Sequence, residues 1–140
     1  MIRYFIELSF KGTGFFGWQT QPKQITVQDT LAGAMHIILQ QDDIKLIGCG
    51  RTDTGVHASQ FFAHFDLEKT LPDPQKTVFK LNGMLPSGIA VKRIFKVDSE
   101  SHARFDASSR TYQYHIHKQK NPFSEDTSLL FYRELDVDKI

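Results

Sequence analysis

The stretch that decides the fold reads IRYFIELS (residues 2–9), and in it apolar and polar positions alternate. Four apolar side chains share one parity: Ile2, Tyr4, Ile6 and Leu8. A period of two is typical of a β-strand that buries one face. The stretch therefore predicts a strand at the start of a sheet.

A helix is predicted after a loop rich in glycine, glutamine and threonine, which runs from Lys11 to Gln24. Thr26 can act as the N-cap, with Asp29 three residues later. Apolar residues then recur at the spacing of one helical face: Val27, Leu31, Ala34, Met35, Ile38 and Leu39. This pattern predicts an amphipathic helix whose apolar side covers the sheet.

The rest of the pattern predicts two short strands, a second helix and a further strand. These are Ile44 to Cys49, Phe61 to Leu67, a helix from Asp73-Pro74 to about Gly83, and Ile89 to Val97. The order β-α-β-β-α-β is typical of an α+β ferredoxin-like or RRM-like plait, with two helices packed on one face of an antiparallel sheet. Arg110 to Lys118 predicts an additional strand.

Length, charge and cysteine content narrow the class of protein. The chain has 140 residues, which suits one domain, and 17 Lys plus Arg against 16 Asp plus Glu give a net charge of +1. That balance excludes a polybasic tail and leaves a local nucleic-acid patch open. One cysteine, Cys49, allows no internal disulfide, so the cytoplasm is the default compartment. No signal peptide or membrane span is expected. No metal site is expected either, because His115 and His117 lack further ligands at a suitable spacing.

The densest chemical pattern reads GRTDTGVHA, from Gly50 to Ala58. Arg51 lies two residues before Asp53, so its guanidinium can orient that carboxylate, hold it ionised or reach past it to a phosphate. The same pattern also suits a surface turn in which Asp53 bonds its own backbone and Arg51 is solvated. The residues alone leave both interpretations open.

This segment resembles the signature of the TruA family of tRNA pseudouridine synthases. Further segments resemble that family in the same order: Gly17-Trp18-Gln19, Val27-Gln28, Leu81-Asn82 with Leu85-Pro86, His102-Ala103-Arg104-Phe105 and Arg110-x-Tyr112-x-Tyr114. Members of the family carry a second, similar half, with the active cleft between the halves. The resemblance implies an N-terminal catalytic domain over residues 1–118, and a connection over 119–140 that leads to a second half.

The resemblance also implies a reaction and a set of site residues. Uridine in the anticodon arm of tRNA would be isomerised to pseudouridine without a cofactor, with Asp53 as the catalytic nucleophile or base. Arg51 would fill or pry open the gap left by the flipped uridine, and Tyr112 would stack on the uracil. A homodimer spanned by tRNA is implied for the full-length protein, and the chain by itself is expected to be inactive.

Two other interpretations remain open at this point. A non-catalytic RNA-binding plait has the same element order, although its central strands would be expected to carry a Gly-Phe-rich aromatic pattern that is lacking here. A structural domain that has no activity without its other half is the third interpretation.

Overall fold

The computed structural model describes residues 1–140. The chain forms two compact units, Met1–Ser108 and Ser109–Ile140. The domain boundary expected at residue 118 stays a prediction. Each unit is described by itself. No helix is long and apolar enough to cross a membrane.

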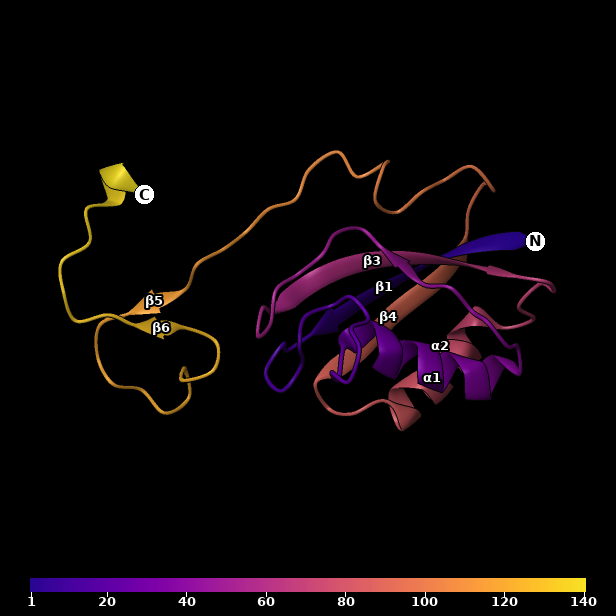
Figure 1. Ribbon diagram of the computed structural model, residues 1–140, viewed down its shortest axis with the longest axis horizontal. Helices are drawn as coiled ribbons and strands as arrows, with labels where there is room; N and C mark the ends of the chain where they lie inside the picture. Colours follow the sequence, from indigo (N-terminus) through magenta and orange to yellow (C-terminus); the bar gives the residue numbers. More distant parts are fainter. The chain divides into compact units, whose positions relative to one another are not determined.

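The first unit is a four-stranded antiparallel sheet with two helices on one face (Figure 1). Its elements are β1 (Ile2–Phe10), α1 (Val27–Leu39), β2 (Ile47–Gly48), β3 (Ala58–Leu67), α2 (Pro74–Met84) and β4 (Ile89–Lys96). The strand order is β2-β3-β1-β4, so β1 lies between β3 and β4. The predicted α+β plait, with its β-α-β-β-α-β order, is confirmed.

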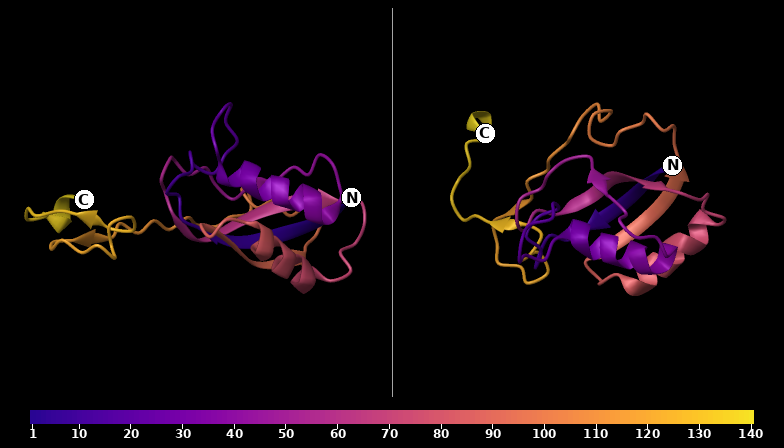
Figure 2. Two further views of the ribbon diagram at one scale, coloured as in Figure 1. Left: turned by 90° about the horizontal axis from the view of Figure 1, so that it is seen from below. Right: turned by 45° about the vertical axis from the view of Figure 1, so that its right-hand side comes forward.

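The core lies between the sheet and the two helices, which pack against each other (Figure 2). Tyr4, Ile6, Leu8 and Phe10 of β1 are all buried, as the period of two predicted. On β3, Phe61, Ala63, Phe65 and Leu67 continue the same buried face. The alternation in sequence therefore sets the side of the sheet that the helices cover.

Both helices begin at the caps that the sequence predicted. Thr26 Oγ1 accepts a hydrogen bond from the Asp29 backbone N–H at 3.2 Å, and Asp73 Oδ1 accepts one from the Lys76 N–H at 3.0 Å. Each bond satisfies an N–H that the first helical turn leaves without an intrahelical acceptor. The caps fix where the chain turns from the loops into α1 and α2.

Two predicted strands are shorter than expected. The strand expected over Ile44 to Cys49 forms only as β2, because only Ile47 and Gly48 are paired in register with β3. The additional strand expected over Arg110 to Lys118 forms only as β5 (Ile116–His117) in the second unit. It pairs in parallel with β6 (Leu129–Leu130), not with the main sheet. The residues before it are exposed, so no buried face stabilises a longer strand.

Candidate active site

The loop that carries Asp53 is held by the glycine-rich loop after β1. The Trp18 N–H donates to the Thr52 carbonyl at 3.4 Å, and the Gly55 N–H donates to the Phe15 carbonyl at 3.3 Å. The Gly12 N–H donates to Nδ1 of His57 at 2.8 Å. We call residues 11–18 and 50–57 the paired loops, because hydrogen bonds join them at both ends.

Two glycines allow the paired loops to approach so closely. A Cβ at Gly12 would lie 2.2 Å from the Val56 carbonyl oxygen, and one at Gly17 would lie 2.3 Å from that of Thr52. Gly17 also has φ of +77°, a conformation that L side chains rarely adopt. Glycine is therefore required at both positions by the lack of space, and at Gly17 also by the backbone conformation.

Asp53 opens a tight turn that points its side chain into solvent. The Val56 N–H donates to the Asp53 carbonyl at 3.2 Å, and Gly55 has the positive φ, +81°, that a type II turn needs at its third residue. The Asp53 carboxylate is exposed and accepts no hydrogen bond from the chain. The surface-turn interpretation required a bond from this side chain to its own backbone, and no such bond is present.

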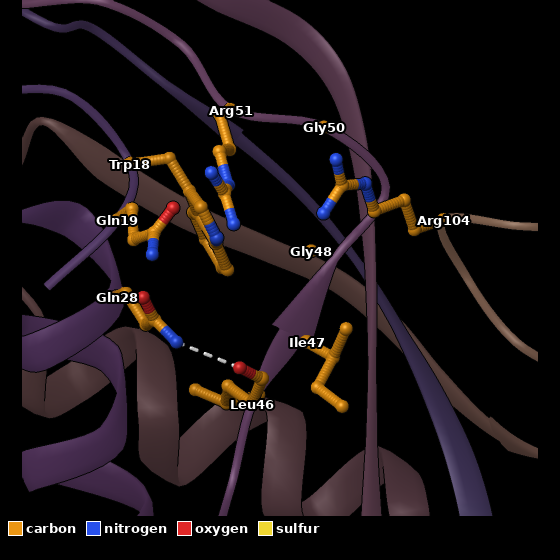
Figure 3. A pocket seen from close by; sticks show the side chains of 9 residues that line it. All are labelled: Trp18, Gln19, Gln28, Leu46, Ile47, Gly48, Gly50, Arg51 and Arg104. Atoms are coloured by element: carbon orange, nitrogen blue, oxygen red, sulfur yellow. Dashed lines mark hydrogen bonds between the residues drawn. The ribbon is translucent and has the colours of Figure 1, made fainter.

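Arg51 does not pair with Asp53. Its side chain lines a pocket of about 160 Å³ (Figure 3). We call this pocket the arginine pocket, and its lining residues are Trp18, Gln19, Gln28, Leu46, Ile47, Gly48, Gly50, Arg51 and Arg104. Arg51 was expected to orient the Asp53 carboxylate, to hold it ionised or to reach a phosphate. The structure does not show Arg51 orienting the carboxylate.

Trp18 belongs to the core. It is 2% exposed and its ring lies 4.5 Å from that of Phe61 and 6.3 Å from that of Phe10, between centroids. A Cβ at Gly48 would come within 2.5 Å of the Trp18 indole nitrogen. The ring thus closes the end of the sheet and forms one wall of the arginine pocket.

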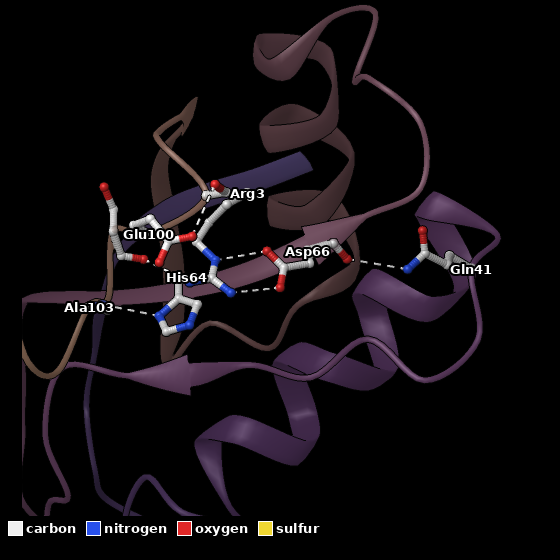
Figure 4. A network of polar contacts seen from close by, with 8 residues as sticks. Arg3, Gln41, His64, Asp66, Glu100 and Ala103 are labelled. Carbon is white, nitrogen blue, oxygen red and sulfur yellow. Dashed lines mark hydrogen bonds and ion pairs between the residues drawn. The ribbon is translucent and has the colours of Figure 1, made fainter. Parts of the chain in front are cut away.

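The segment after β4 brings Arg104 to the same pocket. The Ala103 N–H donates to Nδ1 of the buried His64 at 3.1 Å, and the Arg3 guanidinium donates to the Ser101 carbonyl at 3.0 Å (Figure 4). Sequence reasoning quoted Arg104 only as part of a family segment and did not select it as a site residue. Because Arg104 and Arg51 are far apart in the sequence, the sequence does not indicate that they line the same pocket.

His64 is the titratable group that burial affects most. Burial, together with the smaller electrostatic effects of Arg3 and His102, lowers its pKa to about 4. Because Nδ1 accepts from Ala103, the neutral ring carries its proton on Nε2, which is buried without a partner. Nearby, a hydrogen-bonded Arg3 lowers the pKa of the Asp66 carboxyl.

Tyr112, the third predicted site residue, lies in the second unit and is 62% exposed. His115 and His117 are in the same unit, and His117 Nδ1 lies 2.9 Å from the Ser128 hydroxyl oxygen. No three His, Cys, Asp or Glu side chains gather in a way that could hold a metal ion.

A sequence model of the tRNA pseudouridine synthases matches residues 8–106 of this chain, which is most of the first unit and includes Asp53. The chain belongs to this family. The matched range contains both paired loops and every residue of the arginine pocket. The resemblance noted in the sequence is thus confirmed at the level of the family.

Curated relatives agree with this assignment. The chain is 44% identical to tRNA pseudouridine synthase A of Porphyromonas gingivalis over all of its length, and 44% identical to that of Bacteroides fragilis over 99% of it. The protein of the same name from Aquifex aeolicus is 39% identical over 99% of the chain. The aligned regions cover 56%, 54% and 57% of these relatives, so the chain spans about half of their length.

Proposed function

We propose that this chain supplies the catalytic aspartate, Asp53, of an enzyme that isomerises uridine to pseudouridine in the anticodon arm of tRNA. The observation that carries the proposal is the state of the Asp53 side chain: it is exposed and unpaired, on a turn whose backbone is held by the paired loops. A carboxylate in this state is accessible to a substrate without first breaking a bond within the protein.

The reaction needs such a group because uracil must leave C1′ of its ribose, rotate and rejoin through C5. A carboxylate can add to C6 of the base, or assist at C1′ as nucleophile or by stabilising positive charge on the sugar. It can later help to remove the C5 proton. Both routes use Asp53 and neither requires a cofactor.

Arg51 and Tyr112 are proposed as substrate-binding residues. Arg51 is adjacent to the turn of Asp53 and would contact the RNA beside the flipped uridine. Tyr112 would stack on the uracil face and offer its hydroxyl to the leaving region, and its exposed ring is available for such a contact.

The same proposal sets the partners of the protein. tRNA is the substrate, the protein acts as a homodimer, and tRNA places its site of action in the cytoplasm. The alternative of a non-catalytic RNA-binding plait requires an open aromatic platform on the bare face of the sheet. That face does carry aromatic rings, with Phe5 against His64 and Phe95. It also bears the ion pairs of Arg3 with Asp66 and of Arg93 with Glu7, and Arg3 and His64 bond to Ser101 and Ala103 of the segment after β4, so the rings do not form an open platform.

The test is the Asp53→Asn substitution in the protein as encoded, including any sequence beyond Ile140. The amide keeps the shape of the side chain and removes its negative charge, so release of tritium from C5-labelled uridine in tRNA should stop while tRNA binding persists. Asp43→Asn, at another exposed aspartate, is the matched control and should turn over normally. Turnover by the Asp53 variant would contradict the proposal.

Tyr112 is tested with a matched pair of variants. Tyr112→Phe keeps the ring and loses the hydroxyl, whereas Tyr112→Leu also loses the stacking face, which is worth about 1–3 kcal/mol in single-strand recognition. Wild-type turnover by both variants would remove Tyr112 from the site.

A further inference from the structure

The arginine pocket has a composition that the proposed chemistry of Asp53 does not use. Arg51 reaches it from the loop after β2, and Arg104 reaches it from the segment after β4 (Figure 3). No Asp or Glu lines the pocket. Two guanidinium groups that line one pocket repel each other. An anion between them would attract both groups and offset this repulsion.

A further donor lies at this pocket. The Trp18 indole N–H donates to no acceptor within the chain, and unlike Nε2 of His64 its nitrogen keeps contact with solvent. Figure 3 shows the indole nitrogen on the pocket side of the ring, near Gly48. The N–H is therefore accessible to a ligand in the pocket.

The neighbouring amide of Gln28 is already occupied. Its Nε2 donates to the Leu46 carbonyl at 2.7 Å, and its Oε1 accepts from the Thr20 N–H at 2.9 Å. Gln28 therefore fixes the wall between α1 and β2 and does not add an acceptor to the pocket. The guanidinium groups of Arg51 and Arg104 and the indole N–H of Trp18, which also line the pocket, are all donors.

The size of the pocket limits what the ligand can be. Its volume of about 160 Å³ is below the roughly 300–1,000 Å³ typical of sites that enclose a whole small molecule. A nucleoside would not fit, whereas a phosphate group would. The oxygens of a phosphate also match the fork of N–H donors on a guanidinium.

We propose that the arginine pocket binds one phosphate of the tRNA backbone next to the uridine that Asp53 acts on, and that Arg104 and Arg51 share this phosphate. Contacts to phosphates fix the register of a nucleic acid on a protein without reading its sequence. Arg104 is thus a positioning residue. This inference rests on the proposed function for the identity of the RNA.

The architecture supports a positioning role because Arg104 extends from an anchored segment. The His102 N–H donates to Asp106 Oδ2 at 2.7 Å, and the Arg104 N–H donates to Nδ1 of His102 at 3.2 Å. Together with the bond from Ala103 to His64, these contacts hold the backbone on both sides of Arg104.

The first experiment measures binding of unmodified tRNA to this chain by fluorescence anisotropy at several salt concentrations. Arg104→Gln should weaken binding on the order of tenfold and lower the slope of log Kd against log salt by about 1, which corresponds to one phosphate contact. Lys80→Gln removes one exposed positive charge on α2 and is the matched control. A slope for Arg104→Gln equal to that of the wild type would overturn the proposal.

A double-mutant cycle tests whether the two arginines share one phosphate. If they do, Arg51→Gln combined with Arg104→Gln should cost less than the sum of the single changes. Additive effects, with each arginine lowering the salt slope separately, would show two independent contacts and overturn the shared site.

The indole N–H of Trp18 provides a readout inside the pocket, because the chain has one tryptophan. Its single indole cross-peak in a ¹⁵N correlation spectrum should shift when tRNA is added to the wild type, and not with Arg104→Gln. Inorganic phosphate at matched ionic strength is the second arm. A shift with inorganic phosphate and none with tRNA would show a site for free phosphate and would overturn the RNA proposal.

The two proposals fail separately. Turnover by Asp53→Asn alongside an Arg104-dependent salt slope would contradict only the proposed chemistry. Loss of turnover by Asp53→Asn with no Arg104 dependence of binding would contradict only the phosphate site.

Discussion

A glycine can be required because of its backbone conformation or because there is no space for a side chain. The glycines of the loop after β1 allow these two reasons to be distinguished. Gly14 and Gly17 both have positive φ, +82° and +77°. A Cβ at Gly14 would meet nothing within 4 Å, whereas one at Gly17 would lie 2.3 Å from the Thr52 carbonyl oxygen. Of these two glycines, only Gly17 is therefore constrained by the paired loops.

This difference predicts unequal effects of the same substitution. Gly14→Ala should cost only the strain of positive φ, about 1–2 kcal/mol. Gly17→Ala should cost a further 1–3 kcal/mol or so, because the added methyl group separates the loops. Urea unfolding measures both, and equal losses of stability would show that the close approach at Thr52 contributes nothing. Pseudouridine formation should fall for Gly17→Ala alone.

His64 predicts a dependence of stability on pH. Its pKa is about 4 in the folded chain against about 6.5 when unfolded, so between these values the unfolded chain binds the extra proton. Stability should therefore fall as pH drops through this window, by on the order of 2 kcal/mol between pH 7 and pH 5. Urea midpoints at the two pH values measure it.

Substitution isolates the contribution of this side chain. His64→Gln should lose most of the pH dependence between 5 and 7, whatever its absolute stability. His36→Gln, at an exposed histidine on α1, should keep it. Equal pH dependence in the His64 variant and the wild type would contradict a buried neutral imidazole.

At the residue scale, the sequence predicted what a contiguous motif encodes. The segment from Gly50 to Ala58 singled out Asp53 and Arg51 because the residues are neighbours in the chain. It did not predict that Arg51 lines a pocket with Trp18 and Arg104 and forms no ion pair with Asp53. Such a pocket arises only when the segments before α1 and after β4 meet in the folded chain.

Among the elements, the two helices were predictable because their signals are local. Thr26 and Asp73 cap the helices that follow them, within the span of one turn. The bounds of strand β2 were not predictable, because its two residues depend on pairing with His64 and Ala63 of β3, which lie elsewhere in the sequence. Its apolar neighbours Ile44 and Leu46 raised the expectation of a longer strand.

The cap of α1 predicts an effect on both stability and RNA binding. Thr26 is fully buried, and its hydroxyl accepts from the Asp29 N–H and donates to the Asp29 carboxylate. Thr26→Ala should cost about 1–2 kcal/mol of unfolding free energy. It should also weaken tRNA binding, because Gln28 in the first turn of α1 holds the wall of the arginine pocket.

Thr26→Ser keeps the hydroxyl and is the matched control, with a loss of well under 1 kcal/mol expected from the missing methyl group. Chemical denaturation and anisotropy measure the two effects. A serine variant as unstable as the alanine variant would show that packing of the methyl group, and not the cap, matters at this position.

For the whole molecule, the first unit holds all of the buried apolar core, from Tyr4 to Ala103. We therefore expect residues 1–140 to unfold in one cooperative thermal transition. The same chain should bind tRNA weakly, with strong salt dependence, and should form no pseudouridine. Asp53 is exposed in this chain, whereas electrostatic catalysis works best where water is excluded.

Mass spectrometry of derivatised tRNA after incubation with the purified chain tests this expectation, and unmodified tRNA without protein is the control. Multiple turnovers would show that these 140 residues contain a complete site. In that case, the roughly half of each relative that lies outside the aligned region would not be needed for the reaction.

The backbone bonds between the paired loops have a consequence for how this chain fluctuates. Loops usually open on their own, at little cost in free energy, while the sheet beneath them stays closed. Here the amides of Gly12, Trp18 and Gly55 are each bonded across to the opposite loop or its side chain. Neither loop can open without releasing the other, and Trp18 ties both to the core. Deuterium should therefore enter these loop amides about as slowly as it enters the strands, so the aspartate rests on a segment that opens only with the fold.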